Sequence, residues 1–568
     1  MAPNGRNLSA VTPWWRSAII YEVYIRSFAD GDGDGVGDIA GLRSRLPYLA
    51  DLGVDALWIT PWYPSPMRDG GYDVSDLLGI DRAFGTLEEA RELIAEVHHL
   101  GLRVLLDLVP NHLSDRHPWF QAALAAPAGS PARARFIFRD GRGPAGEEPP
   151  NDWTSNFGGP AWTRVTEPDG RLGQWYLHLF TPAQPDLDWT NSEVREEFAR
   201  TMRFWFELGV DGFRIDVAHG LIKAEGLPDL QPVGSAPAPD HTASHPHWDR
   251  DEVHEIYRSW RALADAYADP RIFVAEAWVN GPERLARYVR PDELHTAFNF
   301  DFLLAHWHPA PMRRTIAATL RAHEAVGAPP TWVLSNHDTV REVSRYARPA
   351  DGRPVRRLDD LIARPADLAA GRRRARAAAL LMLALPGGAY IYQGEELGLA
   401  EVEDLPDEVL RDPGWEQSGH TRRGRDGCRV PIPWSGLEPP FGFSPPSASA
   451  PPWLPQPPDW RSQTVEAESA EEDSTLTLYR GALRLRRAHP ALGDGTLRWI
   501  EVQAGALAFV REPGFACIVN FWSEPVEPPA EADVMIVSGP LQDDGRVPAD
   551  TAVWFAVRPR PGLSSPGW

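Results

Sequence analysis

Three acidic residues each end a short apolar run that is predicted to be a buried strand. The runs are residues 212–216, 273–276 and 332–338, and they end in Asp216, Glu276 and Asp338. Because catalytic groups of parallel barrels sit at the carboxyl ends of different strands, these side chains should converge. One ionised carboxylate can attack an anomeric carbon while a second, protonated one donates to the leaving oxygen, and a third can bind sugar hydroxyls. The pattern predicts cleavage of a glycosidic bond.

Arg214 stands two residues before Asp216, so the two side chains share one face of the strand. An unpaired carboxylate is costly to bury, so Arg214 should hold Asp216 ionised, as a nucleophile requires. A purely structural ion pair is one alternative. A metal centre is another, but no HExxH or similarly close ligand pair is present. His112 and His337 each adjoin an asparagine and are interpreted as donors of hydrogen bonds to substrate hydroxyls.

Eight apolar runs alternate with helical patterns, which predicts an α/β fold, a closed (β/α)8 TIM barrel. The predicted strands lie at residues 19–25, 56–60, 104–108, 212–217, 273–276, 294–298, 332–338 and 389–392. The predicted helices between them include residues 43–52, 87–100, 192–208 and 253–267. A doubly wound open sheet is the alternative. It would need an early Gly-rich phosphate loop, and the sequence has none.

Two stretches depart from this alternation. Residues 113–177 are rich in glycine, proline and aromatic residues, and segments near residues 506–511 and 516–522 alternate as antiparallel strands do. We therefore predict a catalytic barrel at residues 1–112 and 178–490, an inserted loop-rich domain at 113–177 and a C-terminal antiparallel β domain at 491–568.

Composition narrows the classes of partner. The formal charge of −22 disfavours phosphate backbones and anionic membranes, so we expect no nucleic acid, no membrane and a small sugar as partner. The 23 tryptophans offer flat faces to sugar rings as well as core volume. Two cysteines exclude a disulfide framework, and no apolar leader or run of 18 apolar residues appears. We expect a cytoplasmic monomer or homodimer with no organic cofactor.

Six sequence blocks closely resemble glycoside hydrolase family 13, the α-amylase family, and within it the α-glucosidase and oligo-1,6-glucosidase branch. The blocks, in family order, are DLVPNH at 107–112, QPDLDW at 184–189, GFRIDV at 212–217, FVAE at 273–276, SNHD at 335–338 and QGEELG at 393–398. The resemblance covers nearly the whole chain. It implies that Asp216 is the nucleophile, Glu276 the general acid/base and Asp338 the transition-state stabiliser, with Arg214, His112 and His337 contacting the sugar.

Two further segments are similar to this branch alone. RDGGYD at 68–73 resembles its exo-acting signature, which implies that Asp69 binds the terminal sugar's distal hydroxyls and that Tyr72 stacks on its ring. GRDGCRVPIPW at 424–434 resembles SRDNARTPMQW of the branch, which implies an Asp69–Arg425 ion pair that seals the pocket. Phe157, Phe180 and Gln184 match pocket-wall positions, with ordinary packing as the alternative for the phenylalanines.

Linkage preference depends on the residue after the nucleophile. Val217 is the type that this branch associates with α-1,6 substrates, whereas threonine accompanies α-1,4 preference. One methyl-for-hydroxyl difference discriminates modestly, so both linkages stay open.

Acidic residues alternate with glycines in DGDGDGVGD at residues 30–38, a spacing that can wrap oxygens around a hard cation. The twelfth position is Gly41 rather than Glu, which contradicts a full EF-hand. The family resemblance implies a structural Ca²⁺, and a solvated acidic turn is the alternative. The implied ligands are Asp30, Asp32, Asp34, Asp38 and the Val36 carbonyl.

The first hypothesis is a retaining exo-α-glucosidase that removes terminal α-linked glucose from short α-glucosides. A transglucosylase or isomerase of the same family, trehalose synthase-like or sucrose-active, is the second. A barrel without catalysis that serves as a binding subunit is the third, but this chain retains the three acids.

Overall fold

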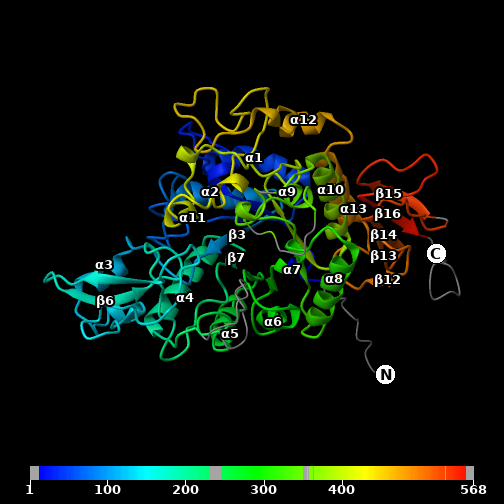
Figure 1. Cartoon of the computed structure of the whole chain (residues 1–568). Coiled ribbons are helices and arrows are strands. Elements are labelled where there is room, and N and C mark those ends of the chain that lie inside the picture. The colour runs from blue at the N-terminus through cyan, green and yellow to red at the C-terminus, as the bar shows by residue number, and fades with distance from the viewer. Residues whose placement is uncertain are drawn as a thin grey trace, which may run out of the picture.

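The centre of the molecule is one eight-stranded parallel sheet (Figure 1). The computed structural model describes residues 12–230, 245–349, 355, 357–362, 364–530 and 532–557. The strands of the sheet are β1 (Ile19–Val23), β2 (Ala56–Ile59), β3 (Arg103–Leu108), β7 (Gly212–Ile215), β8 (Ile272–Ala275), β9 (Thr296–Ala297), β10 (Thr331–Val333) and β11 (Gly388–Tyr392). Their hydrogen-bonded order is β10-β11-β1-β2-β3-β7-β8-β9. The sheet is a nearly closed barrel, which confirms the predicted fold class.

The barrel strands are short and apolar because both of their faces are buried. Three buried charged residues break this pattern: Glu22 in β1, Asp107 in β3 and Arg214 in β7 are each at most 1 % exposed. A buried charge is costly unless it is paired. These three residues therefore indicate where the interior of the barrel is polar.

Helices separate the strands along the chain and cover the barrel (Figure 1). In α4, the residues Val194, Phe198, Met202 and Trp205 recur every three or four positions and are all buried, as the amphipathic pattern requires. The helices of the barrel region are α1 (Ile39–Leu52), α2 (Leu87–His99), α4 (Ser192–Glu207), α5 (Val253–Ala264), α6 (Pro282–Ala286), α7 (Phe300–Leu303), α8 (Pro309–Glu324), α9 (Glu342–Tyr346) and α10 (Leu368–Ala384). Those that follow are α11 (Pro413–Gln417), α12 (Val465–Ala470) and α13 (Thr475–Ala488).

Two antiparallel sheets lie on opposite sides of the barrel in Figure 1. One falls within the stretch predicted as an insertion, beside α3 (Pro118–Ala125), and consists of β4 (Phe138–Arg139), β5 (Trp162–Thr166) and β6 (Leu172–Leu177). The other is C-terminal and consists of β12 (Arg498–Ile500), β13 (Ala506–Arg511), β14 (Phe515–Asn520), β15 (Ala532–Val537) and β16 (Thr551–Val557). The exact domain boundaries stay a prediction.

Candidate active site

Asp216 and Glu276 follow directly after two neighbouring strands. β7 and β8 pair in parallel with Ile215 opposite Ala275, so the next residue of each strand is one of the two acids. The Glu276 N–H donates to the Ile215 carbonyl over 3.0 Å, which continues the ladder by one step. Residues in register on adjacent strands point to the same face. The two carboxyl groups therefore open on the same mouth of the barrel.

One guanidinium contacts three buried carboxyl groups. Arg214 Nη1 lies 2.7 Å from Asp216 Oδ1 and 2.9 Å from Asp107 Oδ1. Arg214 Nη2 lies 3.2 Å from Glu276 Oε2. The predicted pairing of Arg214 with Asp216 is confirmed. The structure adds that the same side chain ties together β3, β7 and the residue after β8.

Two further donors hold the Glu276 carboxyl group. The Val217 N–H donates to Oε2 over 2.8 Å, and the Trp278 indole N–H donates to Oε1 over 2.8 Å. Val217 adopts a φ of 47°, a left-handed conformation that β-branched residues rarely take. Backbone strain of this kind clusters at functional sites. Here it turns the Val217 N–H toward Glu276.

Asp338, in the loop after β10, lies beside two arginines and His337. Its Oδ1 is 2.8 Å from Arg425 Nη1 and 2.9 Å from Arg429 Nη2, and its Oδ2 is 3.4 Å from His337 Nε2. Burial alone would raise the pKa of Asp338, but His337 and the two arginines outweigh burial and lower that pKa. Asp338 is therefore ionised.

The pKa values of the carboxyl groups around Arg214 are raised, whereas that of Asp338 is lowered. Burial raises the pKa of Asp216 and of Glu276, and Arg214 opposes burial in both. Burial likewise raises the pKa of Asp107 to about 6. One guanidinium cannot neutralise three carboxylates, so at least one of them holds a proton. The bond from Arg214 is shorter to Asp216 than to Glu276, which favours Asp216 as the ionised group and Glu276 as the protonated one.

A hydrogen-bonded chain runs behind this cluster from Glu22 to Asp107. Glu22 Oε1 lies 2.5 Å from His337 Nδ1, His337 Nε2 lies 2.7 Å from the Tyr72 hydroxyl, and Tyr72 donates to Asp107 Oδ2 over 2.9 Å. Burial raises the pKa of Glu22 and lowers the pKa of His337. A protonated Glu22 can therefore donate to a neutral His337, which in turn donates to Tyr72. The Tyr72 and His337 rings stack at 5.4 Å and 8°.

The predicted ion pair between Asp69 and Arg425 is present. Arg425 Nη2 lies 2.6 Å from Asp69 Oδ1, and the same guanidinium reaches Asp412 Oδ2 from Nε over 2.5 Å. Gln184 donates to Asp69 Oδ2 over 3.1 Å and lies at the same distance from His112 Nε2. Loops separated widely in the chain thus meet at Arg425.

Both predicted wall phenylalanines contact this group. The Arg425 guanidinium lies 5.1 Å from the centroid of the Phe157 ring, and the Phe180 ring lies 4.9 Å from that of His112. The two phenylalanine rings are themselves 6.2 Å apart. The structure therefore brings all of the predicted catalytic and sugar-contact residues into one connected site, while their individual roles stay predictions.

The sequence argument missed five residues of this site, namely Glu22, Asp107, Trp278, Asp412 and Arg429. Glu22 and Asp107 interrupt otherwise apolar strands, and that signal could have identified them. Trp278 stands two residues after an expected catalytic acid, and Arg429 lies within a quoted block. Asp412 had no local signal, because only the fold brings it to Arg425.

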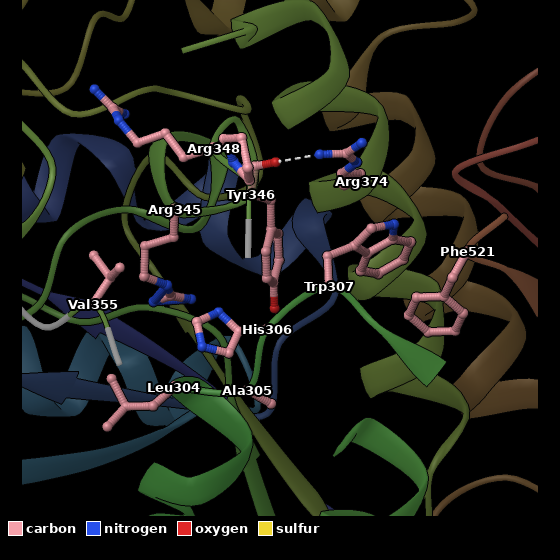
Figure 2. Close-up of a pocket in the computed structure, with 11 residues that line it drawn as sticks. Leu304, Ala305, His306, Trp307, Arg345, Tyr346, Arg348, Val355, Arg374 and Phe521 are labelled. Carbon is pink, nitrogen blue, oxygen red and sulfur yellow. Dashed lines mark hydrogen bonds between the residues drawn. The ribbon is translucent and has the colours of Figure 1, made fainter. Parts of the chain in front are cut away.

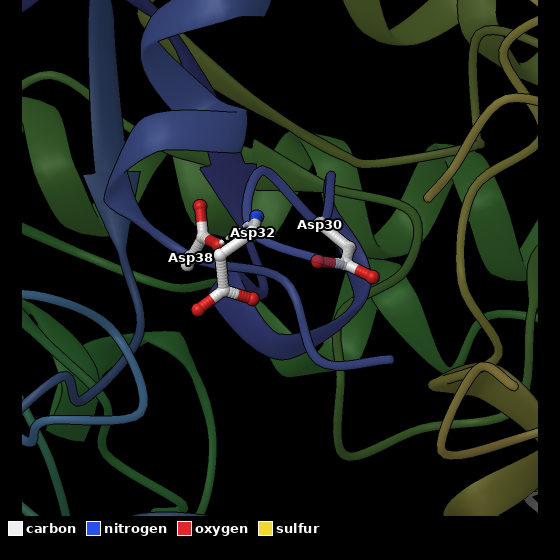
Figure 3. A group of neighbouring side chains, drawn as sticks. All are labelled: Asp30, Asp32 and Asp38. Carbon is white, nitrogen blue, oxygen red and sulfur yellow. Dashed lines mark hydrogen bonds between the residues drawn. The ribbon is translucent and has the colours of Figure 1, made fainter. Parts of the chain in front are cut away.

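The acidic loop before α1 gathers three of the four expected carboxylates. Asp30, Asp32 and Asp38 offer oxygen atoms that all lie within 4.8 Å of one another (Figure 3). Asp34 is outside this group, and its Oδ1 accepts from the Val36 N–H over 2.8 Å. Three carboxylates at such spacing fit a hard cation such as Ca²⁺.

A separate cavity of about 170 Å³ lies where the barrel meets the C-terminal sheet (Figure 2). Its lining includes Arg345, Tyr346, Arg374 and Phe521. Arg374 donates to Asp550 and to the Tyr346 carbonyl, and Arg345 donates to two backbone carbonyls. None of the three carboxylates predicted to be catalytic lines this cavity.

Among the described residues, no helix is long and apolar enough to cross a membrane.

Comparison with known proteins gives a consistent family. The Alpha amylase, catalytic domain family matches residues 22–495. The chain is 39 % identical over 533 residues to a probable alpha-glucosidase of Rhizobium meliloti, covering 90 % of each chain. It is 34 % identical over 517 residues to an oligo-1,6-glucosidase of Parageobacillus thermoglucosidasius, covering 85 % of each.

A solved structure of an alpha-glucosyl transfer enzyme, XgtA, superposes with a TM-score of 0.84 at 33 % identity, covering 96 % of this chain and all of that one. These matches agree with the barrel, with the order of the sequence blocks and with the α-glucosidase and oligo-1,6-glucosidase branch. The chain is a glycoside hydrolase and belongs to the α-amylase family, glycoside hydrolase family 13.

Proposed function

We propose that this protein is a retaining, exo-acting α-glucosidase that hydrolyses terminal α-linked glucose from short α-glucosides. The observation that carries the proposal is the pair of carboxyl groups after β7 and β8, both contacted by Arg214. Retaining glycosidases place their two carboxyl groups close enough for one to attack the sugar directly.

The reaction follows from the two protonation states. An ionised Asp216 attacks the anomeric carbon while Glu276 transfers its proton to the glycosidic oxygen, so the aglycone leaves as an alcohol and a glucosyl ester remains on Asp216. Glu276, now ionised, takes a proton from water, which attacks the same carbon and releases Asp216. Asp338, held ionised by Arg425 and Arg429, would accept bonds from sugar hydroxyls as positive charge develops on the ring.

Action on chain ends is supported by the contacts of Arg425. This side chain joins Asp69, in the loop after β2, to Asp412, which is more than 300 residues later in the chain. These ion pairs link two distant segments of the chain, which supports a pocket that is closed beyond the terminal sugar. Gln184 and His112, bonded to one another beside Asp69, supply polar groups for the hydroxyls of that sugar.

The proposal leaves two features of the reaction open, the linkage that is cleaved and the acceptor of the glucosyl group. Val217 favours neither linkage strongly, so both α-1,4 and α-1,6 glucosides are candidate substrates. Transglucosylation is the second candidate function, because XgtA, named as an alpha-glucosyl transfer enzyme, is among the similar structures. It would use the same glucosyl ester and replace water by a sugar hydroxyl. Product analysis on maltose, isomaltose, trehalose and sucrose separates the two.

A structural Ca²⁺ belongs to the same proposal. Asp30, Asp32 and Asp38 would hold it, and the cation would neutralise their charge at the start of α1. Asp38 already accepts from the Gly41 N–H over 2.6 Å as the cap of that helix. Asp38 would therefore both bind the cation and cap α1.

The test of the covalent step is the substitution Asp216→Asn, which preserves the shape of the side chain. We expect loss of at least about 10⁴-fold in kcat on an aryl α-glucoside with an unchanged circular dichroism spectrum. In the wild type, 5-fluoro-α-glucosyl fluoride should add one fluoroglucosyl group to the peptide that contains Asp216. The control is Asp211→Asn, at the opposite end of β7, which should keep activity. Full activity of Asp216→Asn, or a label on another peptide, would remove Asp216 from this role.

A further inference from the structure

The Trp278 indole N–H faces the Glu276 carboxyl group. Its Nε1 donates to Glu276 Oε1 over 2.8 Å, whereas Oε2 already receives the Val217 N–H and contacts Arg214. Each oxygen of this carboxyl group therefore has its own fixed donor. The carboxyl plane is held on both sides, which leaves little freedom to rotate.

The indole itself is held by a stacked ring. Trp278 and Phe300, the first residue of α7, stack with ring centroids 3.7 Å apart and an angle of 2° between their planes. Phe300 is 6 % exposed, and it packs against Phe298. A side chain fixed in this way loses little further freedom when it makes its hydrogen bond, so the direction of the N–H is set before substrate arrives.

We propose that Trp278 is a positioning residue, whose N–H orients the Glu276 carboxyl group for proton transfer to the leaving oxygen. This inference rests on the proposed role of Glu276 as the general acid/base. Trp278 needs no contact with the sugar for this purpose, since it acts through the carboxyl group. A phenylalanine in its place would keep the stacking partner but remove the bond.

The same bond changes the ionisation of Glu276 in a definite direction. Donation to the carboxylate stabilises the ionised form and lowers the pKa of Glu276, against burial, which raises it. The charged and titratable groups that face Glu276 from the packed elements of the described chain are Arg214, Asp216, Asp107 and Asp338. None of these is altered by a change confined to the indole. Loss of the N–H should therefore raise the pKa of Glu276 and extend the protonated acid to higher pH.

The sharpest test replaces the tryptophan by its sulfur isostere, β-(3-benzothienyl)alanine, at position 278. This residue keeps the shape and the stacking surface and lacks only the N–H. We expect the alkaline limb of kcat/KM against pH to move upward by about one pH unit. We also expect kcat on maltose or isomaltose to fall about tenfold, because their leaving groups need the proton. The activated 2,4-dinitrophenyl α-glucoside should change less than about threefold. Trp278→Phe should reproduce the same shift.

Glu276→Gln separates failure of the inference from failure of the proposed function. In one outcome, Glu276→Gln abolishes hydrolysis of maltose, but the benzothienylalanine variant keeps the wild-type pH profile and loses the same activity on maltose and on the 2,4-dinitrophenyl glucoside. Trp278 then has no positioning role, and the inference is overturned. If Glu276→Gln itself keeps full activity and profile, the proposed function fails as well.

Discussion

The substitution Arg425→Met tests the charge arrangement at the predicted closed end of the pocket. In the wild type, this guanidinium bonds Asp69, Asp338 and Asp412 at 2.5 to 2.8 Å. After the change, Asp338 keeps Arg429, whereas Asp69 and Asp412, with side chains 5 % and 2 % exposed, lose this ion pair. Removing one partner of a buried ion pair costs about 3–5 kcal/mol. We expect a loss of that order at pH 7.

The pH dependence of the loss identifies its cause. In the wild type, Arg425, Arg429 and the Gly414 N–H together outweigh burial and lower the pKa of Asp412. The stability that this residue contributes is therefore complete above the unfolded pKa of about 4 and falls away at lower pH. In the variant, Arg429 and the Gly414 N–H still oppose burial, but the largest opposing group is gone, so we expect burial to raise that pKa above its unfolded value. The variant should then gain stability as pH falls from 7 to 5, while the contribution of Asp412 in the wild type stays constant. The difference in the free energy of unfolding between the wild type and Arg425→Met should therefore be smaller at pH 5 than at pH 7.

Urea unfolding followed by tryptophan fluorescence at pH 7 and pH 5 measures both effects. The matched control is Arg203→Met, which breaks an exposed ion pair with Glu196 at 3.2 Å and should cost less than about 1 kcal/mol at either pH. Equal midpoints for Arg425→Met and the control, or a gap that does not depend on pH, would refute this reasoning.

Three other substitutions address separate parts of the site. Tyr72→Phe keeps the ring that stacks on His337 but loses the bond to Asp107, so kcat/KM on maltose should fall about tenfold; an unchanged value contradicts a role for the hydroxyl. Val217→Thr keeps a β-branched residue at a φ of 47° and should raise the ratio of α-1,4 to α-1,6 kcat/KM by less than about tenfold; a fixed ratio argues that this position does not select the linkage. Added CaCl₂ should raise the Tm of the wild type over that in EDTA, and Asp38→Asn should lose most of this rise; the same rise in both proteins places the cation elsewhere.

Local patterns in the chain were sufficient to predict the barrel and the three carboxylates that we propose to be catalytic. Parallel strands buried on both faces must be short and apolar, so the eight strands are visible as apolar runs, and three of these runs are followed by the acids Asp216, Glu276 and Asp338. The helix predicted at residues 87–100 is α2 (Leu87–His99), because its capping box and the positive φ of Gly101 are local signals.

Tertiary structure decided which charges share a partner. Arg214 was expected to pair with Asp216. The register of β3, β7 and β8 also brings its guanidinium to Asp107 and Glu276. Arg425 also bonds Asp69, which lies 356 residues earlier in the chain, and no local pattern brings those two side chains together. The residue types and the strand periodicity are properties of short segments and are readable from the chain. The protonation states of the buried carboxyl groups cannot be read from the chain, because they depend on burial and on distances between segments that only the folded barrel brings together.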